Sequence, residues 1–309
     1  MPIQPVDKIW MDGKLVDWED ANVHVLTHAL HYGSGVFEGI RAYETPRGAG
    51  IFRLTDHTRR LFTSASVYMI EVPFRQEEIV EATKETVRVN GLVSCYIRPI
   101  VYHGYGEMGL NPLYAPVNMA VAVWPWGTYL GDECLENGAR VMISTWRRPD
   151  PNVLPAQAKA TGQYINSGLA KVEAIKAGYD DAIMLGPDGR IGEGTGENLF
   201  IVRDGVLVTP PESSGILKGI TRDSVIMIAR DLGYEVIERN LVRSDVYTAD
   251  EAFLTGTAAE VTPIREVDGR TIGTGTRGAI TKELQQTYFS AVTGDIEKYA
   301  HWVEHADPS

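Results

Sequence analysis

The sequence predicts an α+β protein of two domains, each built on a mixed or antiparallel sheet with helices packed against it. The chain has 309 residues, and a length of about 150 residues per domain favours two domains. Asp12-Gly13, Asp188-Gly189 and Asp204-Gly205 separate short apolar runs, a pattern typical of β-hairpins. With 44% hydrophobic and 23% charged residues, the composition is that of a globular protein with a large core.

The first half combines strand and helix patterns. After a hairpin of residues 9–11 and 14–16, we expect strands at 36–43, 50–54, 94–102 and 117–124. One helix is expected to start at a cap on Asp56 and to run to about Met69. A second is expected from Gln76 to Asn90, where Gly91 would end it.

Residues 126–138 carry three glycines without periodicity and are interpreted as an interdomain linker. The domains would then be a small N-terminal one, 1–125, and a large C-terminal one, 139–309. In the second domain we expect a strand at 140–145, the two later hairpins, and helices at about 163–177, 220–232 and 279–292.

Charge and targeting signals narrow the function classes. The net charge is 29 − 41 = −12, and an acidic surface of this kind argues against nucleic-acid binding. No apolar run approaches the roughly 20 residues that span a bilayer, and the N-terminus lacks the pattern of a secretory signal. We therefore expect a cytoplasmic protein without membrane contact. Cys95 and Cys134 lack CxxC spacing, so we expect both to be reduced.

Two motifs invite a cofactor or metal interpretation. The glycine-rich segment 192–196 precedes a strand, whereas a dinucleotide fingerprint needs a helix there, so its embedded Glu193 is the informative residue. Taken alone, however, this segment favours a surface turn carboxylate. His24, His28 and His31 have helical spacing, but β-branched neighbours and the lack of supporting carboxylates or cysteines argue against a metal site, and we expect none.

Lys159 differs from the other lysines of the chain in its surroundings. Its neighbours include Ala156, Ala158, Ala160 and Gly162, with nothing acidic nearby. A desolvated amine loses its proton more readily and becomes a nucleophile, which is what a Schiff base with an aldehyde cofactor requires. The local pattern by itself still favours an ordinary loop lysine.

Two turns could hold an anion. Residues 215–223 open a helix with glycines and Thr221, and the exposed N–H groups of a helix N-terminus bind phosphate well, although an ordinary helix cap fits this segment equally. The small polar turn 256–259 follows a strand and could offer further N–H groups.

Taken together, the segments resemble pyridoxal-phosphate enzymes of fold type IV, the D-amino acid aminotransferase-like fold, and among them the branched-chain amino acid aminotransferases. The resemblance extends from Trp10 to about Gly294. It rests on seven motifs in the family order: HALHYGSGVFEGIRAY (28–43), YIRPIV (96–101), PWGTYLG (125–131), AKATGQY (158–164), GEGTGENLF (192–200), LKGITRD (217–223) and TGTAAEVTP (255–263).

This resemblance implies roles for the residues that bind pyridoxal phosphate. Lys159 would form the Schiff base and then move the proton between substrate and cofactor, while Glu193 would pair with the pyridine nitrogen. Tyr164 would bind the 3-hydroxyl group. The phosphate would be held by a guanidinium, a helix N-terminus and a turn: Arg60, Gly219, Ile220, Thr221 and Thr257.

The resemblance also implies a substrate pocket with an apolar wall. That wall would consist of Phe37, Trp126, Tyr129, Tyr164 and Tyr32, the last from the neighbouring subunit. Arg98 would receive the side-chain carboxylate of glutamate. The α-carboxylate would lie on the N–H groups of Thr257 and Ala258 and on the Tyr96 hydroxyl.

The implied activity is transfer of the amino group of L-leucine, L-isoleucine or L-valine to 2-oxoglutarate by a ping-pong mechanism. D-amino acid aminotransferases and aminodeoxychorismate lyases share the scaffold and remain alternatives, as does a catalytically silent scaffold protein. Met108-Gly109 and the residues around Phe37 and Tyr96 match the branched-chain pattern. A wall residue from a second subunit implies at least a dimer, and a hexamer of three dimers is compatible with it.

Overall fold

A computed structural model describes residues 3–127 and 130–307. The chain forms two compact units. Unit 1 comprises Met1–Trp126, Ala158–Gln163 and Ser290–Ser309, and unit 2 comprises Gly127–Gln157 and Tyr164–Phe289. The domain limits expected from the sequence stay a prediction, but the segment 126–138 does contain a helix, α4 (Asp132–Asn137).

In its described part, unit 1 has an eight-stranded sheet in the order β17-β5-β4-β6-β7-β1-β2, with β3 also paired to β6. All these pairs are antiparallel. The strands are β1 (Lys8–Met11), β2 (Lys14–Asp17), β3 (Gly35–Phe37), β4 (Ile40–Thr45), β5 (Gly48–Phe52), β6 (Cys95–His103), β7 (Val117–Trp124) and β17 (Val303–His305). The helices are α1 (His28–Tyr32), α2 (Leu54–Val67), α3 (Gln76–Val89) and the 3₁₀ helices η1 (Trp18–Asp20) and η4 (Glu297–Trp302).

The start of unit 1 confirms the hairpin, because Asp12 and Gly13 both take positive φ values, 48° and 90°, as a two-residue turn of this kind requires. The cap on Asp56 was a wrong prediction. Helix α2 begins at Leu54 after Arg53 in a left-handed conformation, and Asp56 lies in its first turn. There its carboxylate accepts from Arg53 Nε at 2.7 Å and from Arg59 Nη1 at 2.8 Å.

The single strand expected at 36–43 is interrupted at Glu38 and Gly39. On one side of the gap Phe37 pairs with Ile100, and on the other Ile40 pairs with Ile97, so the register is kept. Pro99 lies opposite Glu38 and has no N–H group to donate to the ladder, which explains the break.

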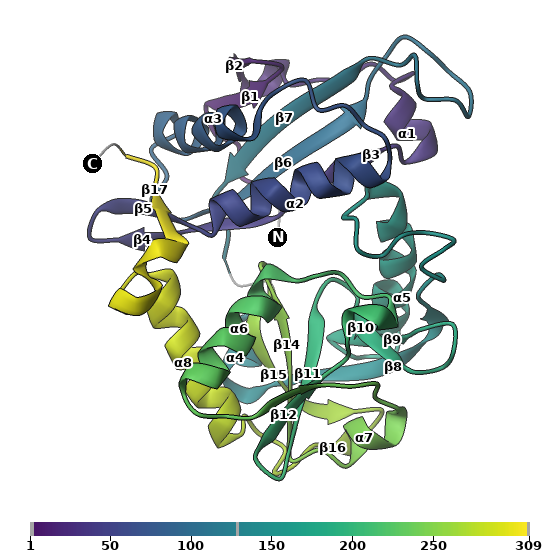
Figure 1. The fold of residues 1–309 in the computed structure, drawn as a ribbon, viewed down its shortest axis with the longest axis vertical. Helices are drawn as coiled ribbons and strands as arrows, with labels where there is room; N and C mark the ends of the chain where they lie inside the picture. Colours follow the sequence, from purple (N-terminus) through teal and green to yellow (C-terminus); the bar gives the residue numbers. More distant parts are fainter. Residues whose placement is uncertain (1–2, 128–129, 308–309) are drawn as a thin grey trace. The chain divides into compact units, whose positions relative to one another are not determined.

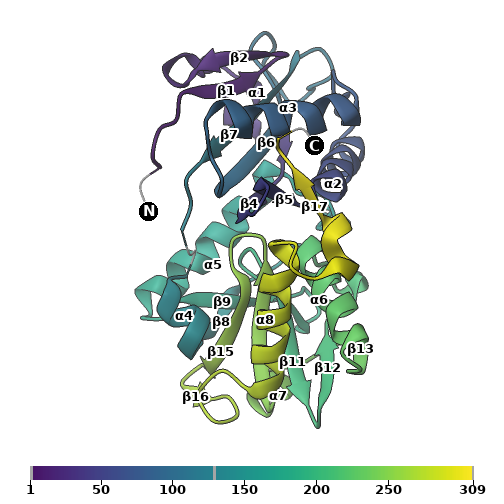
Figure 2. The same cartoon turned by 90° about the vertical axis from the view of Figure 1, so that its left-hand side faces the viewer.

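The C-terminal segment completes the sheet of unit 1, although no strand was expected there. Figure 2 shows β17 beside β5, and the pairing is Val303 with Phe52 through His305 with Gly50. Beyond it, the Ala306 N–H donates to Ala49 O at 3.0 Å. The edge strand β5 is thereby covered.

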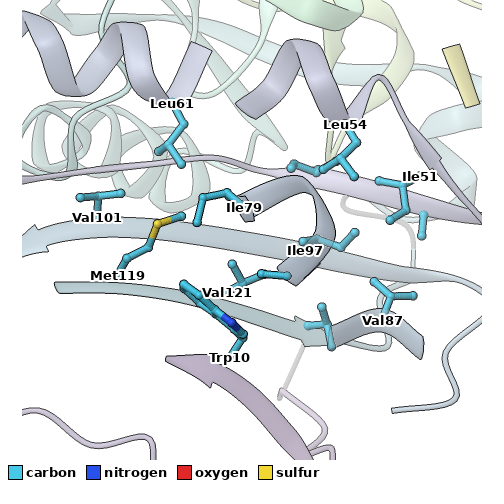
Figure 3. Packing of buried hydrophobic residues seen from close by; sticks show 14 of the residues in the cluster. Trp10, Ile51, Leu54, Leu61, Ile79, Val87, Ile97, Val101, Met119 and Val121 are labelled. Atoms are coloured by element: carbon cyan, nitrogen blue, oxygen red, sulfur yellow. The ribbon is translucent and has the colours of Figure 1, made fainter. Parts of the chain in front are cut away.

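Helices α2 and α3 pack on the sheet of unit 1 (Figure 1). Figure 3 shows buried side chains of the hydrophobic core that the helices and the sheet share. They come from both helices and from four strands: Leu54, Leu61, Ile79, Val87, Ile51, Ile97, Val101, Met119, Val121 and Trp10. Burial of this apolar surface fixes α2, and with it the residues of α2 that belong to the site.

Unit 2 has a nine-stranded sheet in its described part, in the order β10-β9-β8-β15-β14-β11-β12-β13, with β16 paired to β15. It is mixed, because β8 runs parallel to β9 and β15 while β11 is antiparallel to β12 and β14. The strands are β8 (Ala139–Arg147), β9 (Asp181–Leu185), β10 (Ile191–Gly194), β11 (Asn198–Arg203), β12 (Val206–Thr209), β13 (Val236–Glu238), β14 (Glu251–Gly256), β15 (Glu260–Val267) and β16 (Arg270–Thr271). Besides α4, the helices here are α5 (Tyr164–Lys176), α6 (Ile220–Asp231), α7 (Arg243–Tyr247), α8 (Ala279–Val292) and the 3₁₀ helix η3 (Glu212–Ser214). The 3₁₀ helix η2 (Thr161–Gln163) belongs to unit 1.

These two sheets with packed helices confirm the α+β class. The hairpins at Asp188-Gly189 and Asp204-Gly205 are also confirmed, as β9–β10 and β11–β12.

Both cysteines are free thiols, and burial raises the pKa of Cys95 to about 12. Within the described residues, no helix combines the length and apolar character needed to cross a membrane.

Candidate active site

Lys159 belongs to unit 1, where its backbone is held on both sides. Its N–H donates to Ser64 Oγ on α2 at 3.0 Å, and its carbonyl accepts from the Phe37 N–H at 3.0 Å. The next residue, Ala160, forms an isolated antiparallel bridge with Val36. The lysine loop therefore runs along β3 like a further strand, which fixes the point from which the amine extends.

The Phe37 ring lies beside two basic side chains. Lys159 Nζ is 5.0 Å from its centroid, and Arg98 Cζ is 4.8 Å away. Tyr96 and Trp124 also face Arg98, with centroids at 5.3 and 5.9 Å. Arg98 Nε has no hydrogen-bond partner among the described residues. An arginine surrounded by aromatic faces in this way is suited to receiving a carboxylate from a ligand.

Tyr96 requires a glycine opposite it. A Cβ atom on Gly39 would collide with the Tyr96 hydroxyl, so the gap between β3 and β4 accommodates that hydroxyl. The Tyr96 ring packs against Trp124 and Trp126, each with centroids 5.1 Å away. Of the expected substrate residues, unit 1 thus brings Phe37, Tyr96, Arg98 and Trp126 together.

Arg60, expected at the phosphate, lies on α2 and forms a side-on fork with Glu38. Its Nε donates to Oε1 at 2.7 Å and its Nη2 to Oε2 at 2.8 Å. His57 Nδ1 is 2.7 Å from the same Oε2, and the His57 and Glu38 side chains are almost wholly buried. Burial alone would raise the pKa of Glu38, but Arg60 and His57 outweigh it and hold that pKa far below its usual value. Burial lowers the pKa of His57, so the imidazole is neutral and donates to the carboxylate.

Helix α1 ends at Tyr32, which is 42% exposed. A contribution of Tyr32 to a second subunit stays a prediction, and Tyr129 lies outside the described residues. The three histidines near α1 have separate partners. His24 Nδ1 accepts from Leu26 N at 3.1 Å, His28 lies within 2.6 Å of Ser34 Oγ, and His31 Nε2 lies 2.9 Å from Val25 O. In the described part of the chain no three metal-binding side chains cluster.

Glu193 belongs to unit 2 and is buried on β10, not exposed in a turn. Its Oε1 is 2.7 Å from Arg148 Nη2. Its Oε2 accepts from Asn198 Nδ2 at 3.1 Å and from the Leu217 N–H at 3.0 Å. These donors come from separate segments and fix the carboxylate in position.

Helix α6 begins at Ile220 with Gly219 as its N-cap, which confirms a helix N-terminus at the expected phosphate site. Thr221 is buried in the first turn. The Asn198 amide also donates to Leu217 O at 3.0 Å, and a Cβ on Gly219 would collide with its Oδ1. Asn198 therefore ties the Glu193 carboxylate to the start of α6.

The turn of Thr257, Ala258 and Ala259 joins β14 to β15, as expected. Gly256 packs against residues 196–197, because a Cβ there would lie 3.4 Å from Gly196 O. Tyr164 is the first residue of α5. Unit 2 thus brings the expected anion-binding turn close to the segment that follows Glu193, and the role of each of these residues stays a prediction.

Glu197 is a buried carboxylate behind this site. Its Oε2 accepts from the Gly196 N–H at 2.9 Å. Burial, followed by the charge of Asp181, raises the pKa of Glu197 to about 8. Asp181 itself is paired with Lys171 at 2.7 Å and accepts from Thr195 Oγ1 at 2.7 Å. Glu197 is therefore mainly protonated at neutral pH.

This raised pKa makes stability depend on pH. The favourable contribution of the protonated Glu197 is complete below the ordinary pKa of 4.5 and is lost as pH rises through about 8. We expect the loss to amount to a few kcal/mol, on the order of 1.4 kcal/mol per pKa unit. Glu197→Gln should flatten the fall in melting temperature between pH 6 and 9, whereas exposed Glu235→Gln should not. An unchanged slope in Glu197→Gln would contradict the assignment.

Four residues of these networks were not found from the sequence: Glu38, His57, Arg148 and Asn198. Glu38 carried a signal, because a lone carboxylate within a mostly apolar strand pattern requires a buried partner. Arg148, next to a proline in a loop, carried none. Its partner is distant in the sequence, and only the fold brings the two together.

Comparison with known proteins shows the family to which the chain belongs. The model of the class IV amino-transferases matches residues 35–267, and the chain belongs to this family. It is therefore an aminotransferase of fold type IV, which confirms the fold and enzyme class expected from the motifs.

Several relatives named branched-chain-amino-acid aminotransferase are similar over nearly their whole length. The Pseudomonas aeruginosa protein is 52% identical over 95% of each chain, and the Escherichia coli K12 protein is 47% identical over 99% of this chain and 100% of that one. A crystal structure of the T.th. branched-chain amino acid aminotransferase with pyridoxamine 5'-phosphate superposes with a TM-score of 0.96 at 51% identity, covering 99% of this chain and 100% of that one.

Proposed function

We propose that this protein transfers the amino group of L-leucine, L-isoleucine or L-valine to 2-oxoglutarate, with pyridoxal phosphate as its cofactor and a ping-pong mechanism. The names of the relatives support the substrates. The T.th. structures with pyridoxamine 5'-phosphate and with N-(5'-phosphopyridoxyl)-L-glutamate support the cofactor.

The donor set fits this cofactor. A fixed carboxylate, Glu193, suits a protonated ring nitrogen, and the N-terminus of α6 with Thr221 suits a phosphate dianion. When bound, pyridoxal phosphate supplies an aldehyde carbon that takes up the amino group and a ring that delocalises an electron pair. The residues that we propose to hold it are Lys159, Glu193, Tyr164, Arg60, Gly219, Ile220, Thr221 and Thr257.

Lys159 has two tasks in this proposal. Its amine would hold the aldehyde group of the cofactor covalently and, when free, would take up the proton from the substrate Cα and return it to the cofactor. The N–H groups of Thr257 and Ala258 and the Tyr96 hydroxyl hold the substrate α-carboxylate. The apolar wall of the pocket is formed by Phe37, Trp126, Tyr129, Tyr164 and Tyr32 of the partner subunit.

The contact of Phe37 with both Lys159 and Arg98 is the observation that carries the proposal. An apolar ring next to the reactive amine accommodates a leucine side chain. The guanidinium on the same ring accommodates the second carboxylate of 2-oxoglutarate or glutamate. One pocket can thus serve both half-reactions.

Arg98→Ala tests whether the guanidinium serves the dicarboxylic substrates and not leucine. We expect kcat/KM for 2-oxoglutarate to fall about 10–100-fold, since a charge-assisted hydrogen bond is worth about 1.5–3 kcal/mol. Utilisation of L-leucine should change much less, because leucine has no second carboxylate. Exposed Arg47→Ala is the matched control. Equal losses for both substrates would refute the role of Arg98.

The visible absorption spectrum of the holoenzyme tests the function as a whole. On addition of L-leucine, the yellow band should convert into the near-ultraviolet band of the pyridoxamine form, and 2-oxoglutarate should restore it. A band that responds to D-alanine and not to L-leucine would transfer the function to the D-amino acid aminotransferases. A protein that takes up no pyridoxal phosphate would contradict the proposal.

We further infer that the protein acts in the cytoplasm. We also infer that it is a homo-oligomer of at least two subunits, since the proposed wall includes Tyr32 of the partner subunit. Within one chain Tyr32 is exposed and therefore accessible to a second copy. Light scattering of the holoenzyme distinguishes a monomer, which would contradict this, from a dimer or a hexamer.

A further inference from the structure

Arg148 is a buried arginine directly after β8. Its backbone N–H donates to Leu185 O at 2.8 Å, which anchors the residue beside β9. Its Nη2 reaches Glu193 Oε1 at 2.7 Å, with the two side chains only 8% and 7% exposed. Its Nη1 lies 3.4 Å from Ser167 Oγ. Burying such an ion pair is costly because both charges lose their hydration. Apolar side chains of similar volume would stabilise the fold at least equally, so packing alone does not explain why an ion pair is present here.

The guanidinium is the charged member of the group that holds Glu193. The other two donors, Asn198 Nδ2 and the Leu217 N–H, are neutral amides that fix the direction of Oε2. They would orient a carboxylate whether or not Arg148 were present. The additional effect of Arg148 is electrostatic, because a cation in contact favours the anionic form of a carboxylate.

Neither Lys171 nor Glu197 replaces this cation. Lys171 is paired with Asp181 at 2.7 Å. Glu197 is mainly protonated at neutral pH, since burial raises its pKa to about 8. The ion pair of Arg148 and Glu193 therefore places a positive charge in direct contact with this carboxylate.

We propose that Arg148 is a positioning residue which keeps the proton shared by Glu193 and the cofactor ring on the ring nitrogen. This role rests on the proposed function, in which Glu193 faces that nitrogen. With Arg148 in place the carboxylate is a weak base and the nitrogen keeps the proton. Without Arg148 the carboxylate becomes more basic, the proton passes to Glu193, and the ring is left neutral and withdraws electrons less well.

The ¹⁵N resonance of the ring nitrogen, in enzyme loaded with ¹⁵N-labelled pyridoxal phosphate, reports the position of the proton independently of activity. In Arg148→Met we expect this resonance to move toward that of an unprotonated pyridine. We also expect kcat for L-leucine to fall about 10–100-fold with little change in KM, as for other supporting partners of active-site groups. Arg148→Lys keeps the charge and should retain a protonated ring. Arg147→Met, at an exposed neighbouring arginine, is the matched control.

A protonated ring nitrogen in folded Arg148→Met would overturn this role, and so would an unprotonated one in Arg148→Lys. The second variant decides the matter if Arg148→Met does not fold. The wild type separates the two proposals. If it binds pyridoxal phosphate and converts L-leucine while the variants fail the test, only the role of Arg148 is lost. If it binds none, both proposals are overturned.

Discussion

Lys159→Ala should abolish turnover of L-leucine. The variant lacks the amine that binds the cofactor and the base that moves the proton from the substrate. Because a positioned acid–base group alone contributes about 10²–10⁴-fold, we expect a loss of at least about 10⁴-fold. The protein should still fold, because Lys159 is held by its backbone, through Ser64 Oγ and the Phe37 N–H, and these bonds do not need the side chain.

Steady-state kinetics and the absorption spectrum together check this expectation. Lys159→Ala should bind pyridoxal phosphate non-covalently, without the band of the covalent adduct, and its melting curve without cofactor should match that of the wild type. Lys176→Ala, at an exposed lysine in the last turn of α5, serves as the control and should remain active. Near-full activity of Lys159→Ala would refute the assignment of the active-site lysine.

The second large effect is expected on stability, in Glu38→Ala. The substitution removes the carboxylate that accepts from Arg60, whose side chain is 12% exposed, and from the almost wholly buried His57. Removing one partner of a buried ion pair typically costs about 3–5 kcal/mol. Since Arg60 also loses the contacts that fix its side chain, the affinity for pyridoxal phosphate should fall as well.

Chemical denaturation of the cofactor-free protein measures the first effect and equilibrium titration with pyridoxal phosphate the second. Glu38→Gln keeps the shape of the side chain and one acceptor, so its effect should be intermediate. Glu44→Ala, at an exposed carboxylate on the neighbouring strand β4, should be nearly neutral. A Glu38→Ala protein as stable as the wild type would show that Arg60 and His57 find other partners.

Local signals in the sequence predicted most elements of the fold. The turn at Asp12-Gly13 depends on two residues alone, and α8 (Ala279–Val292) follows its apolar period, so both were predicted correctly. Two of the errors have tertiary causes. The break between β3 and β4 depends on Pro99 in a partner strand, and β17 is a strand only because β5 offers an edge to pair with.

The candidate site also contains residues that the sequence predicted and partners that it did not. Lys159 and Glu193 lie in motifs long enough to identify a family, and that family supplied the roles that their local surroundings left open. The partners of the site residues lacked such motifs. Glu38 holds Arg60 and Arg148 holds Glu193, and each pair joins segments that are remote in the sequence. Such pairs are specified by the packing of strands and helices and not by any local pattern.

The way the chain divides between the two units limits recombination between homologous genes. Unit 1 draws Ala158–Gln163 and Ser290–Ser309 from beyond the first segment of unit 2, so neither unit is one continuous stretch of chain. A single recombination event cannot exchange one unit between homologues and leave the other intact. Cut after Trp126, the N-terminal fragment would lack both the lysine loop and the strand that covers the edge of β5. Exchange of one whole unit between homologues would therefore need more than one crossover.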